Sequence, residues 1–253
     1  MPTSHKLSLN EKAYQKINER IITLELRPGS RVDERSLEKL LSIGRTPIRE
    51  ALFRLVAEGL VESVPKRGFF VKPITIDDVK SLFEAVMFSE RVCAFLSAKR
   101  VGKNQIEKVH QLHTDLQKAM KKRDFLKVTL LNSDFHRIIH EATENKFLCS
   151  SLNHLQNQIQ RLAYLAYTKE TTPNDLEVHF SRVTEDHENI IALLEKRDQK
   201  GLVLKVTEHI QLFYSRIVIY MSPPIEGLDI ILEGDSAKLG YEVRADPLAL
   251  TKG

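Results

Sequence analysis

The sequence predicts a mainly α fold, with an N-terminal winged helix-turn-helix followed by a C-terminal all-α helical bundle. Apolar residues recur at helical spacing along most of the chain. Only 10 glycines occur in 253 residues, which argues against a strand-rich fold with many turns. Two short apolar runs near residues 60–71 are the exception, and they predict a hairpin. A chain of this length has room for two domains at roughly 100–200 residues each.

The composition excludes several classes of protein. Apolar residues make up 42% of the chain and charged residues 28%, as in an ordinary globular protein. No stretch approaches the ~18–20 apolar residues of a membrane span, and the N-terminus lacks the apolar core of a signal peptide. Cys93 and Cys149 are too few for a disulfide framework or a multi-cysteine metal site. We therefore expect a cytoplasmic protein with no membrane partner.

Positive charge is concentrated at the N-terminal end. Residues 1–75 carry 14 Lys and Arg against 9 Asp and Glu, a net charge of +5. Residues 76–221 have a net charge of +2, and residues 222–253 a net charge of −3. The first segment is therefore suited to a polyanionic partner. A solvated basic face without a partner explains the charge alone equally well.

Two helices are expected in the first part of the chain. Apolar spacing predicts the first over residues 10–25, and the turn-forming pair Pro28 and Gly29 follows it. The second begins after Asp33, whose side chain is typical of an N-cap.

A third helix follows after a short turn, in which Gly44 supplies the required backbone angle. Thr46 is the expected N-cap, and Pro47 occupies the first helical position. The helix opens with Arg45 and Arg49 beside this cap. Two helices joined by so tight a turn describe a helix-turn-helix.

The predicted hairpin completes a winged helix. Its strands are residues 60–64 and 69–71, and the turn between them is Pro-Lys-Arg-Gly at residues 65–68. The tip places Lys66 and Arg67 near the DNA backbone or the minor groove. The alternative is a basic surface hairpin with no partner.

These motifs resemble the GntR family of bacterial transcription regulators, and the match covers nearly all of residues 10–75. The residues that carry it are LRPGSRVDE at 26–34, GRTPIREAL at 44–52, Arg54-Leu55, EGLV at 58–61 and Arg67-Gly68. The resemblance implies that operator DNA is contacted by Arg35, Arg45, Thr46, Arg49 and the wing glycine Gly68. Gly44 stands where the family usually has Ser or Thr, so a hydroxyl contact to phosphate is missing. We place the DNA-binding domain at residues 8–75.

The rest of the chain predicts a bundle and a short extension. Six amphipathic helices are expected near residues 76–101, 104–122, 124–143, 145–168, 175–198 and 200–220. We place this domain at residues 76–221. Residues 222–253 form an extension without an assigned role, in which residues 228–232 and 241–244 have the pattern of short strands.

Four residues of the bundle have the spacing of a metal site. Asn132 and His136 are four residues apart and share a helix face. His187 and His209 lie eleven residues before and after Asp198, so each is about 16 Å from that turn at ~1.5 Å per residue. If the two helices that flank Asp198 pack side by side as an antiparallel pair, His187 and His209 lie at the same height along them. Three imidazoles and one oxygen ligand then suit zinc, nickel or a similar divalent ion.

A single histidine is more often a surface or core residue than a metal ligand. His136 and His140 form a second pair at helical spacing, so chance pairs are expected among nine histidines. The remaining histidines are expected at the surface, namely His5, His110, His113, His154 and His179.

The helical half resembles the FCD effector domain of FadR-type GntR proteins. The residues that carry this are NSDFH at 132–136, Asn145, EDH at 185–187, Asp198 and His209. The resemblance implies a metal bound by Asn132, His136, His187 and His209, which helps hold a small carboxylate effector. Asn132 replaces the commoner aspartate and lowers the negative charge of the site. Met87 replaces an arginine common in the first helix, which leaves Arg161 as the candidate effector ligand.

These features predict a ligand-responsive transcription regulator, and a repressor in the first instance. It binds double-stranded operator DNA as a homodimer and senses a small carboxylate. One alternative is a metal sensor, in which the ion itself is the signal. Another is a metal-dependent hydrolase, but HExxH, GxSxG and a glycine-rich phosphate loop are missing, and Asp134 points away from the predicted ligand face. We therefore expect no enzymatic activity.

Overall fold

A computed structural model describes residues 7–168 and 173–221 of the chain. The predicted extension at 222–253, with its two candidate strands, lies outside these residues, as does His5. In chain order, the described elements are α1 Leu9–Ile22, β1 Arg31–Val32, α2 Glu34–Leu41, α3 Arg45–Ala57, β2 Val61–Val64, β3 Gly68–Val71, α4 Ile76–Arg100, α5 Lys103–Lys121, α6 Phe125–Glu141, α7 Lys146–Thr168, α8 Pro173–Glu195 and α9 Gln199–Met221. The mainly α fold and the six bundle helices are thus confirmed.

The N-terminal unit is a winged helix-turn-helix. Its three helices pack around buried side chains such as Ile17, Ile48 and Leu52. Antiparallel β2 and β3 form the expected hairpin, with Val64 opposite Gly68. The two-residue β1, which the sequence did not predict, pairs with β3 on its other side, giving the order β1-β3-β2.

The structure confirms one predicted helix start and corrects another. The Asp33 side chain accepts a hydrogen bond from the backbone N–H of Arg35 at 3.0 Å, as expected of an N-cap. Helix α3, however, begins two residues earlier than expected, at Arg45 instead of Pro47. Gly44 is its N-cap, with an extended backbone (φ −64°), and Thr46 lies inside the first turn. The left-handed residue of the turn is Ser42 (φ 52°), so the turn does not use the conformational freedom of Gly44.

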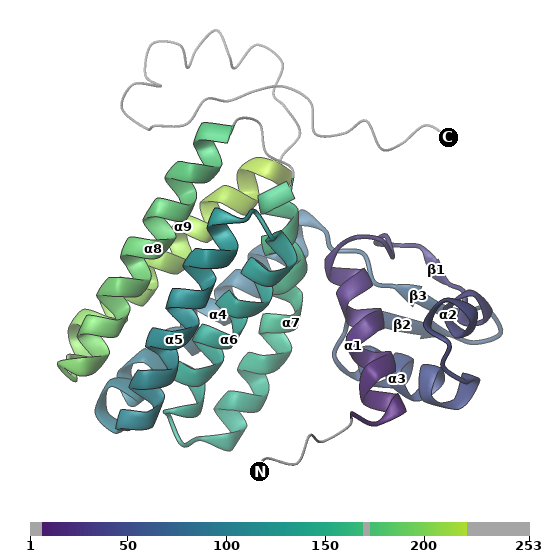
Figure 1. Cartoon of the computed structure of the whole chain (residues 1–253), viewed down its shortest axis with the longest axis horizontal. Coiled ribbons are helices and arrows are strands. Elements are labelled where there is room, and N and C mark those ends of the chain that lie inside the picture. Colours follow the sequence, from purple (N-terminus) through teal and green to yellow (C-terminus); the bar gives the residue numbers. More distant parts are fainter. Residues whose placement is uncertain (1–6, 169–172, 222–253) are drawn as a thin grey trace, which may run out of the picture.

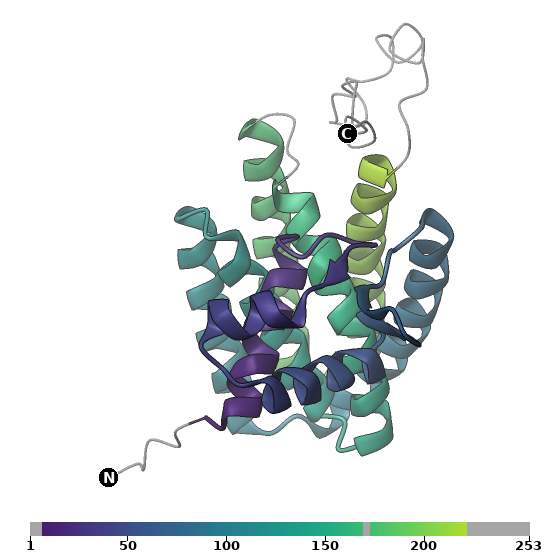
Figure 2. The ribbon, with the colours of Figure 1, turned by 90° about the vertical axis from the view of Figure 1, so that its right-hand side faces the viewer.

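The C-terminal unit is a bundle of long helices with a continuous apolar interior. Phe135, Leu162 and Ile190, from three different helices, are buried in its main core. A second cluster around Leu116, Leu176 and Phe180 fills one side of the bundle. Figure 1 shows the N-terminal unit beside α7, and Figure 2 shows the same unit facing the viewer with the bundle behind it. Within the described ranges, no helix has the length and apolarity needed to span a membrane.

Burial corrects part of the expectation for the histidines. His110 and His154 are exposed, as predicted. His113 and His179 are buried instead, at 7% and 6% exposure. Both lie on helix faces that turn toward the second apolar cluster and the bundle interior, which their isolated positions in the sequence did not reveal.

Candidate DNA-binding surface and metal centre

The start of α3 presents cationic side chains to solvent. Arg45 and Thr46 are exposed, and Arg49 is partly exposed one turn later. Glu34 of α2 lies 3.6 Å from the guanidinium of Arg49 and 4.0 Å from that of Arg45. A carboxylate so placed orients both cations at the N-terminal end of the helix, the part of a recognition helix that meets base edges.

The wing adds further positive charge next to this helix. Lys66 and Gly68 both adopt left-handed backbone angles, at φ 62° and 95°, and so form the tight tip of the hairpin. The Arg67 guanidinium lies 5.3 Å from the centre of the Phe70 ring. Arg31 of β1 also reaches the tip, because a Cβ at Gly68 would lie 3.8 Å from its Nε atom. The sequence did not single out Arg31, because a two-residue strand carries no detectable pattern.

Arg35 is the remaining predicted DNA contact. It is exposed in the first turn of α2, where the Asp33 cap fixes its backbone. Its side chain is therefore free to meet a phosphate at the edge of the same surface.

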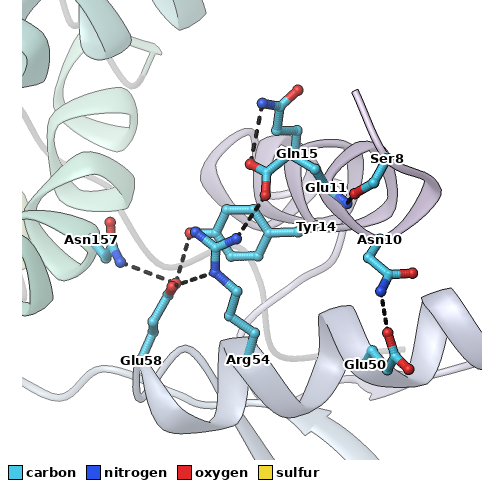
Figure 3. A network of polar contacts seen from close by, with 9 residues as sticks. All are labelled: Ser8, Asn10, Glu11, Tyr14, Gln15, Glu50, Arg54, Glu58 and Asn157. Atoms are coloured by element: carbon cyan, nitrogen blue, oxygen red, sulfur yellow. Dashed lines mark hydrogen bonds and ion pairs between the residues drawn. The ribbon is translucent and has the colours of Figure 1, made fainter. Parts of the chain in front are cut away.

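A polar network joins α1 and α3 to the bundle (Figure 3). The hydroxyl of Tyr14 donates to Glu58 at 2.8 Å, and Asn157 of α7 donates to the same carboxylate at 3.0 Å. Arg54 donates to Glu58 at 3.1 Å and to Glu11 at 2.9 Å. Burial and the Glu58 carboxylate raise the pKa of Tyr14, which keeps its hydroxyl protonated as a donor.

Arg161 belongs to this contact between the domains. Its guanidinium donates to the backbone oxygen of Lys72 at 2.7 Å and to Oε1 of Gln158 at 2.6 Å. Burial lowers the pKa of Arg161 to about 10. The residue does not line the cavity of the bundle. The structure therefore corrects the assignment of Arg161 as an effector ligand, because its hydrogen bonds are made to the linker between the domains and within α7.

A cavity of about 590 Å³, open solvent at its mouth included, lies inside the bundle. Asn132 and His136 line it from α6, and His209 lines it from α9. Among the described lining residues, Glu90 of α4 is the one carboxylate, and neither Lys nor Arg is present. The walls are otherwise largely apolar, with aromatic and aliphatic side chains from α4, α7, α8 and α9.

His136, His187 and His209 converge beside this cavity. One ring nitrogen from each lies within 4.8 Å of the others. His187 is fully buried, and its ring stacks on that of Phe135 with centroids 4.0 Å apart. Neither nitrogen of His187 has a hydrogen-bond partner among the described residues. Leaving such a group unpaired in a core is costly, whereas coordination of a metal would satisfy it.

The charge state of the cluster also suits a metal. Burial lowers the pKa of His136 to about 3, against the opposing effect of Glu90, and it lowers the pKa of His187 well below its usual value. Both imidazoles are therefore neutral at physiological pH, the form that binds metals. Asn132 lines the same cavity one helical turn before His136, so its amide oxygen is available as the fourth ligand.

Asp186 orients the third imidazole, a role the sequence did not reveal. Its Oδ2 lies 3.0 Å from Nδ1 of His209, and its Oδ1 lies 2.5 Å from the ammonium of Lys205. This contact places the His209 ring hydrogen on Nδ1 and leaves Nε2 for a metal. In the sequence, the signal that could have pointed to Asp186 was its position directly before His187.

Glu90 was also missed by the sequence reasoning. It is 5% exposed, and its Oε1 lies 2.8 Å from Nε2 of His140 and 3.3 Å from Nε2 of Gln156. The available signal was its place on the apolar face of α4, four residues from both Val86 and Ala94. Glu90, His136 and His140 form a second group whose ligand atoms lie within 4.8 Å of one another.

Comparisons with known proteins agree with both halves of the fold. Residues 9–71 match the gntR family of bacterial regulatory proteins, and residues 81–212 match the FCD domain. The chain is 21% identical over 203 residues to the HTH-type transcriptional repressor RspR of Escherichia coli K12, covering 80% of this chain and 86% of that protein. It is 25% identical over 199 residues to the Nta operon transcriptional regulator of Aminobacter aminovorans, covering 78% and 89%.

Solved structures show the same fold. Escherichia coli McbR/YncC superposes with a TM-score of 0.73 at 21% identity, covering 83% of this chain and 97% of that one. A GntR transcriptional regulator of Rhodococcus sp. RHA1 gives a TM-score of 0.67 at 16% identity, covering 84% and 98%. With a gntR-type DNA-binding domain matched at one end and an FCD domain at the other, the chain belongs to the GntR family of bacterial transcription regulators, in the FadR-type group that carries an FCD domain.

Proposed function

We propose that this regulator is a homodimeric repressor that acts in the cytoplasm. It binds an operator through α3 and the wing, and a small carboxylate held by a metal in the bundle changes its affinity for that operator. The observation that carries the effector part is the buried cluster of three imidazoles, with both nitrogens of His187 unpartnered among the described residues.

In the proposed DNA complex, the exposed start of α3 enters the major groove. Arg45, Thr46 and Arg49 are placed there to contact base edges. Cations at the edge of this surface hold the phosphates. We assign the latter role to Arg35, Lys66 and Arg67, with Gly68 letting the wing approach the backbone closely.

His136, His187 and His209 would hold the metal through neutral imidazoles, and Asn132 through its amide oxygen. We propose zinc, nickel or a similar divalent ion, since these accept nitrogen ligands. With four neutral ligands, the bound ion would supply an undiminished positive charge to an anionic effector. Asp186 holds His209 in the required tautomer.

Helix α7 is the proposed link between effector and operator. Gln156 and Ile159 line the cavity, while the intervening Asn157 contacts Glu58 at the end of α3. An effector that favours one packing of α7 over another would therefore change the position of the recognition helix. Such a shift is driven only by the difference in effector affinity between the two packings.

A homodimer would present two recognition helices to a palindromic operator. Phe88, Val92 and Phe95 form an exposed apolar row on one face of α4, with exposures of 76%, 40% and 48%. We assign this row to the contact with a second copy. Val92→Glu places a charge in its middle and is expected to convert dimer into monomer in sedimentation experiments. A dimer of unchanged stability would remove α4 from the interface.

His187→Ala tests the effector site. Elemental analysis of the purified protein should show loss of the bound metal, while operator binding measured without effector stays close to wild type. His110→Ala is the matched control, because His110 is exposed and outside the cluster. Equal metal content in wild type and His187→Ala would refute the metal site. If adding metal alone reproduced the full change in operator affinity, the protein would be a metal sensor and the carboxylate part of the proposal would be wrong.

A further inference from the structure

The cavity beside the histidine cluster has an anionic end. Glu90 is 5% exposed and lines the cavity from α4. Neither Arg nor Lys occurs among the described lining residues. A carboxylate effector would therefore find no Lys or Arg among the described residues that line the cavity. The part of the effector that faces α4 would lie near the negative charge of Glu90.

The hydrogen bonds of Glu90 leave one of its oxygens available. His140 and Gln156 both contact Oε1, at 2.8 and 3.3 Å. Among the described residues, Oε2 has no hydrogen-bond partner. A buried carboxylate oxygen of this kind is stabilised by a hydrogen-bond donor, and most strongly by a charged one.

The two ends of the cavity are close together. His136 belongs to the three-imidazole cluster, and its ring also lies within 4.8 Å of the ligand atoms of Glu90 and His140. A carboxylate bound near the three-imidazole cluster and a hydrogen-bond donor bound at Glu90 would therefore be close enough to belong to one small molecule. The rest of the wall is mainly apolar, with Phe83, Val86 and Phe213 among its residues, and it also includes polar side chains such as Asn132 and His179.

We propose that the effector is an α-amino acid with an apolar side chain, whose ammonium group binds Glu90 while its carboxylate faces the three histidines. This inference rests on the proposed metal-dependent effector site and narrows its ligand class. In this proposal, Glu90 makes the site selective for amino acids over simple carboxylic acids. His140 and Gln156 act as positioning residues, since they hold the carboxylate in place.

The test uses matched probes on the full-length, metal-loaded protein. L-Leucine, L-valine and L-phenylalanine are compared with the acid that lacks the amine of each, and with the amine that lacks the carboxylate. Melting temperature and operator affinity are the two readouts. We expect at least one amino acid to raise the melting temperature and change operator affinity, while its two truncated partners do neither.

Glu90→Gln is the matched variant, because it keeps the shape of the side chain and removes its charge. It should retain the metal and weaken binding of the active amino acid about tenfold or more, since a charge-assisted contact is lost. If Glu90→Gln fails to fold, Glu90→Asp, which keeps the charge and withdraws it from the cavity, should give the same preferential loss.

The possible failures are distinguishable. Simple carboxylates binding as well as amino acids, or no amino acid binding to a metal-loaded protein, would overturn the inference and leave the metal site standing. Loss of the metal in Glu90→Gln would make Glu90 a metal ligand and also overturn it. Absence of metal from the wild type would instead refute the proposed function beneath it.

Discussion

The hydroxyl of Tyr14 in α1 lies 2.8 Å from Oε2 of Glu58, the residue that ends α3. The same oxygen accepts a hydrogen bond from Asn157 of α7. One carboxylate therefore connects α1, the end of α3 and α7 of the FCD domain (Figure 3). The Arg54 guanidinium contacts both partners of this hydrogen bond. It lies 3.5 Å from the centre of the Tyr14 ring and donates to Glu58.

Tyr14→Phe should lower the free energy of unfolding by ~1 kcal/mol, the usual net contribution of one hydrogen bond. The ring remains in place, so the change isolates the hydroxyl. Urea unfolding is the measurement, and Tyr164→Phe is the control, because the Tyr164 hydroxyl makes no hydrogen bond to a described residue. If both variants unfold at the wild-type urea concentration, the Glu58 contact does not stabilise the folded state.

The fold was predictable because its helices are long and amphipathic. Six periodic segments separated by short turns leave few alternatives to a bundle. The errors lie at helix ends, where several residues suit the same role. Thr46 and Gly44 are both acceptable N-caps, and in the structure Gly44 takes this role with an extended backbone. β1 was missed because two residues are too few to show alternation.

The candidate site was predictable only in part. Counting residues from Asp198 placed His187 and His209 level, and the structure brings their rings to 5.2 Å. Arg161 was assigned to the effector, but its guanidinium donates to the backbone oxygen of Lys72 and to Gln158 of its own helix. The contact with a backbone oxygen is one that no side-chain pattern reveals. Glu90 was overlooked because its role depends on which helices face α4, and that is known only from the packing.

Arg49→Ala should weaken operator binding by about 1–3 kcal/mol if the guanidinium reads a base. Glu34 and the aromatic rings of Phe53 and Phe69 hold this side chain, at 3.6, 5.9 and 6.0 Å, so it is already oriented before DNA arrives. Fluorescence anisotropy with a labelled operator measures the change. Lys108→Ala, which removes an exposed cation of α5, is the control. An unchanged dissociation constant for Arg49→Ala would exclude this residue from base contact.

Loss of the two wing cations should act on salt dependence more than on sequence preference. Each phosphate contact contributes about 0.9 to the slope of log affinity against log salt, so the Lys66→Ala, Arg67→Ala double variant should show a less steep slope. Lys121→Ala, Lys122→Ala is the matched control, with two adjacent exposed cations on the bundle. If the wing variant and the control variant both keep the wild-type slope of log affinity against log salt, the wing does not contact phosphate.

Asp186→Asn should weaken the metal site without removing any ligand. In the native protein, the Asp186 carboxylate accepts the Nδ1 hydrogen of His209 at 3.0 Å and also neutralises Lys205. A neutral amide keeps the shape of the side chain, but it accepts that hydrogen bond more weakly and makes His209 a poorer electron donor. Loss of such supporting partners typically costs 10–100-fold in metal affinity. Competition with a chromophoric chelator for zinc measures the loss. Glu185→Gln, at the exposed neighbouring position, should leave the affinity unchanged. Equal zinc affinity in both variants would show that His209 either does not bind the metal or needs no partner to do so, and the wild-type stoichiometry would then decide between these two readings.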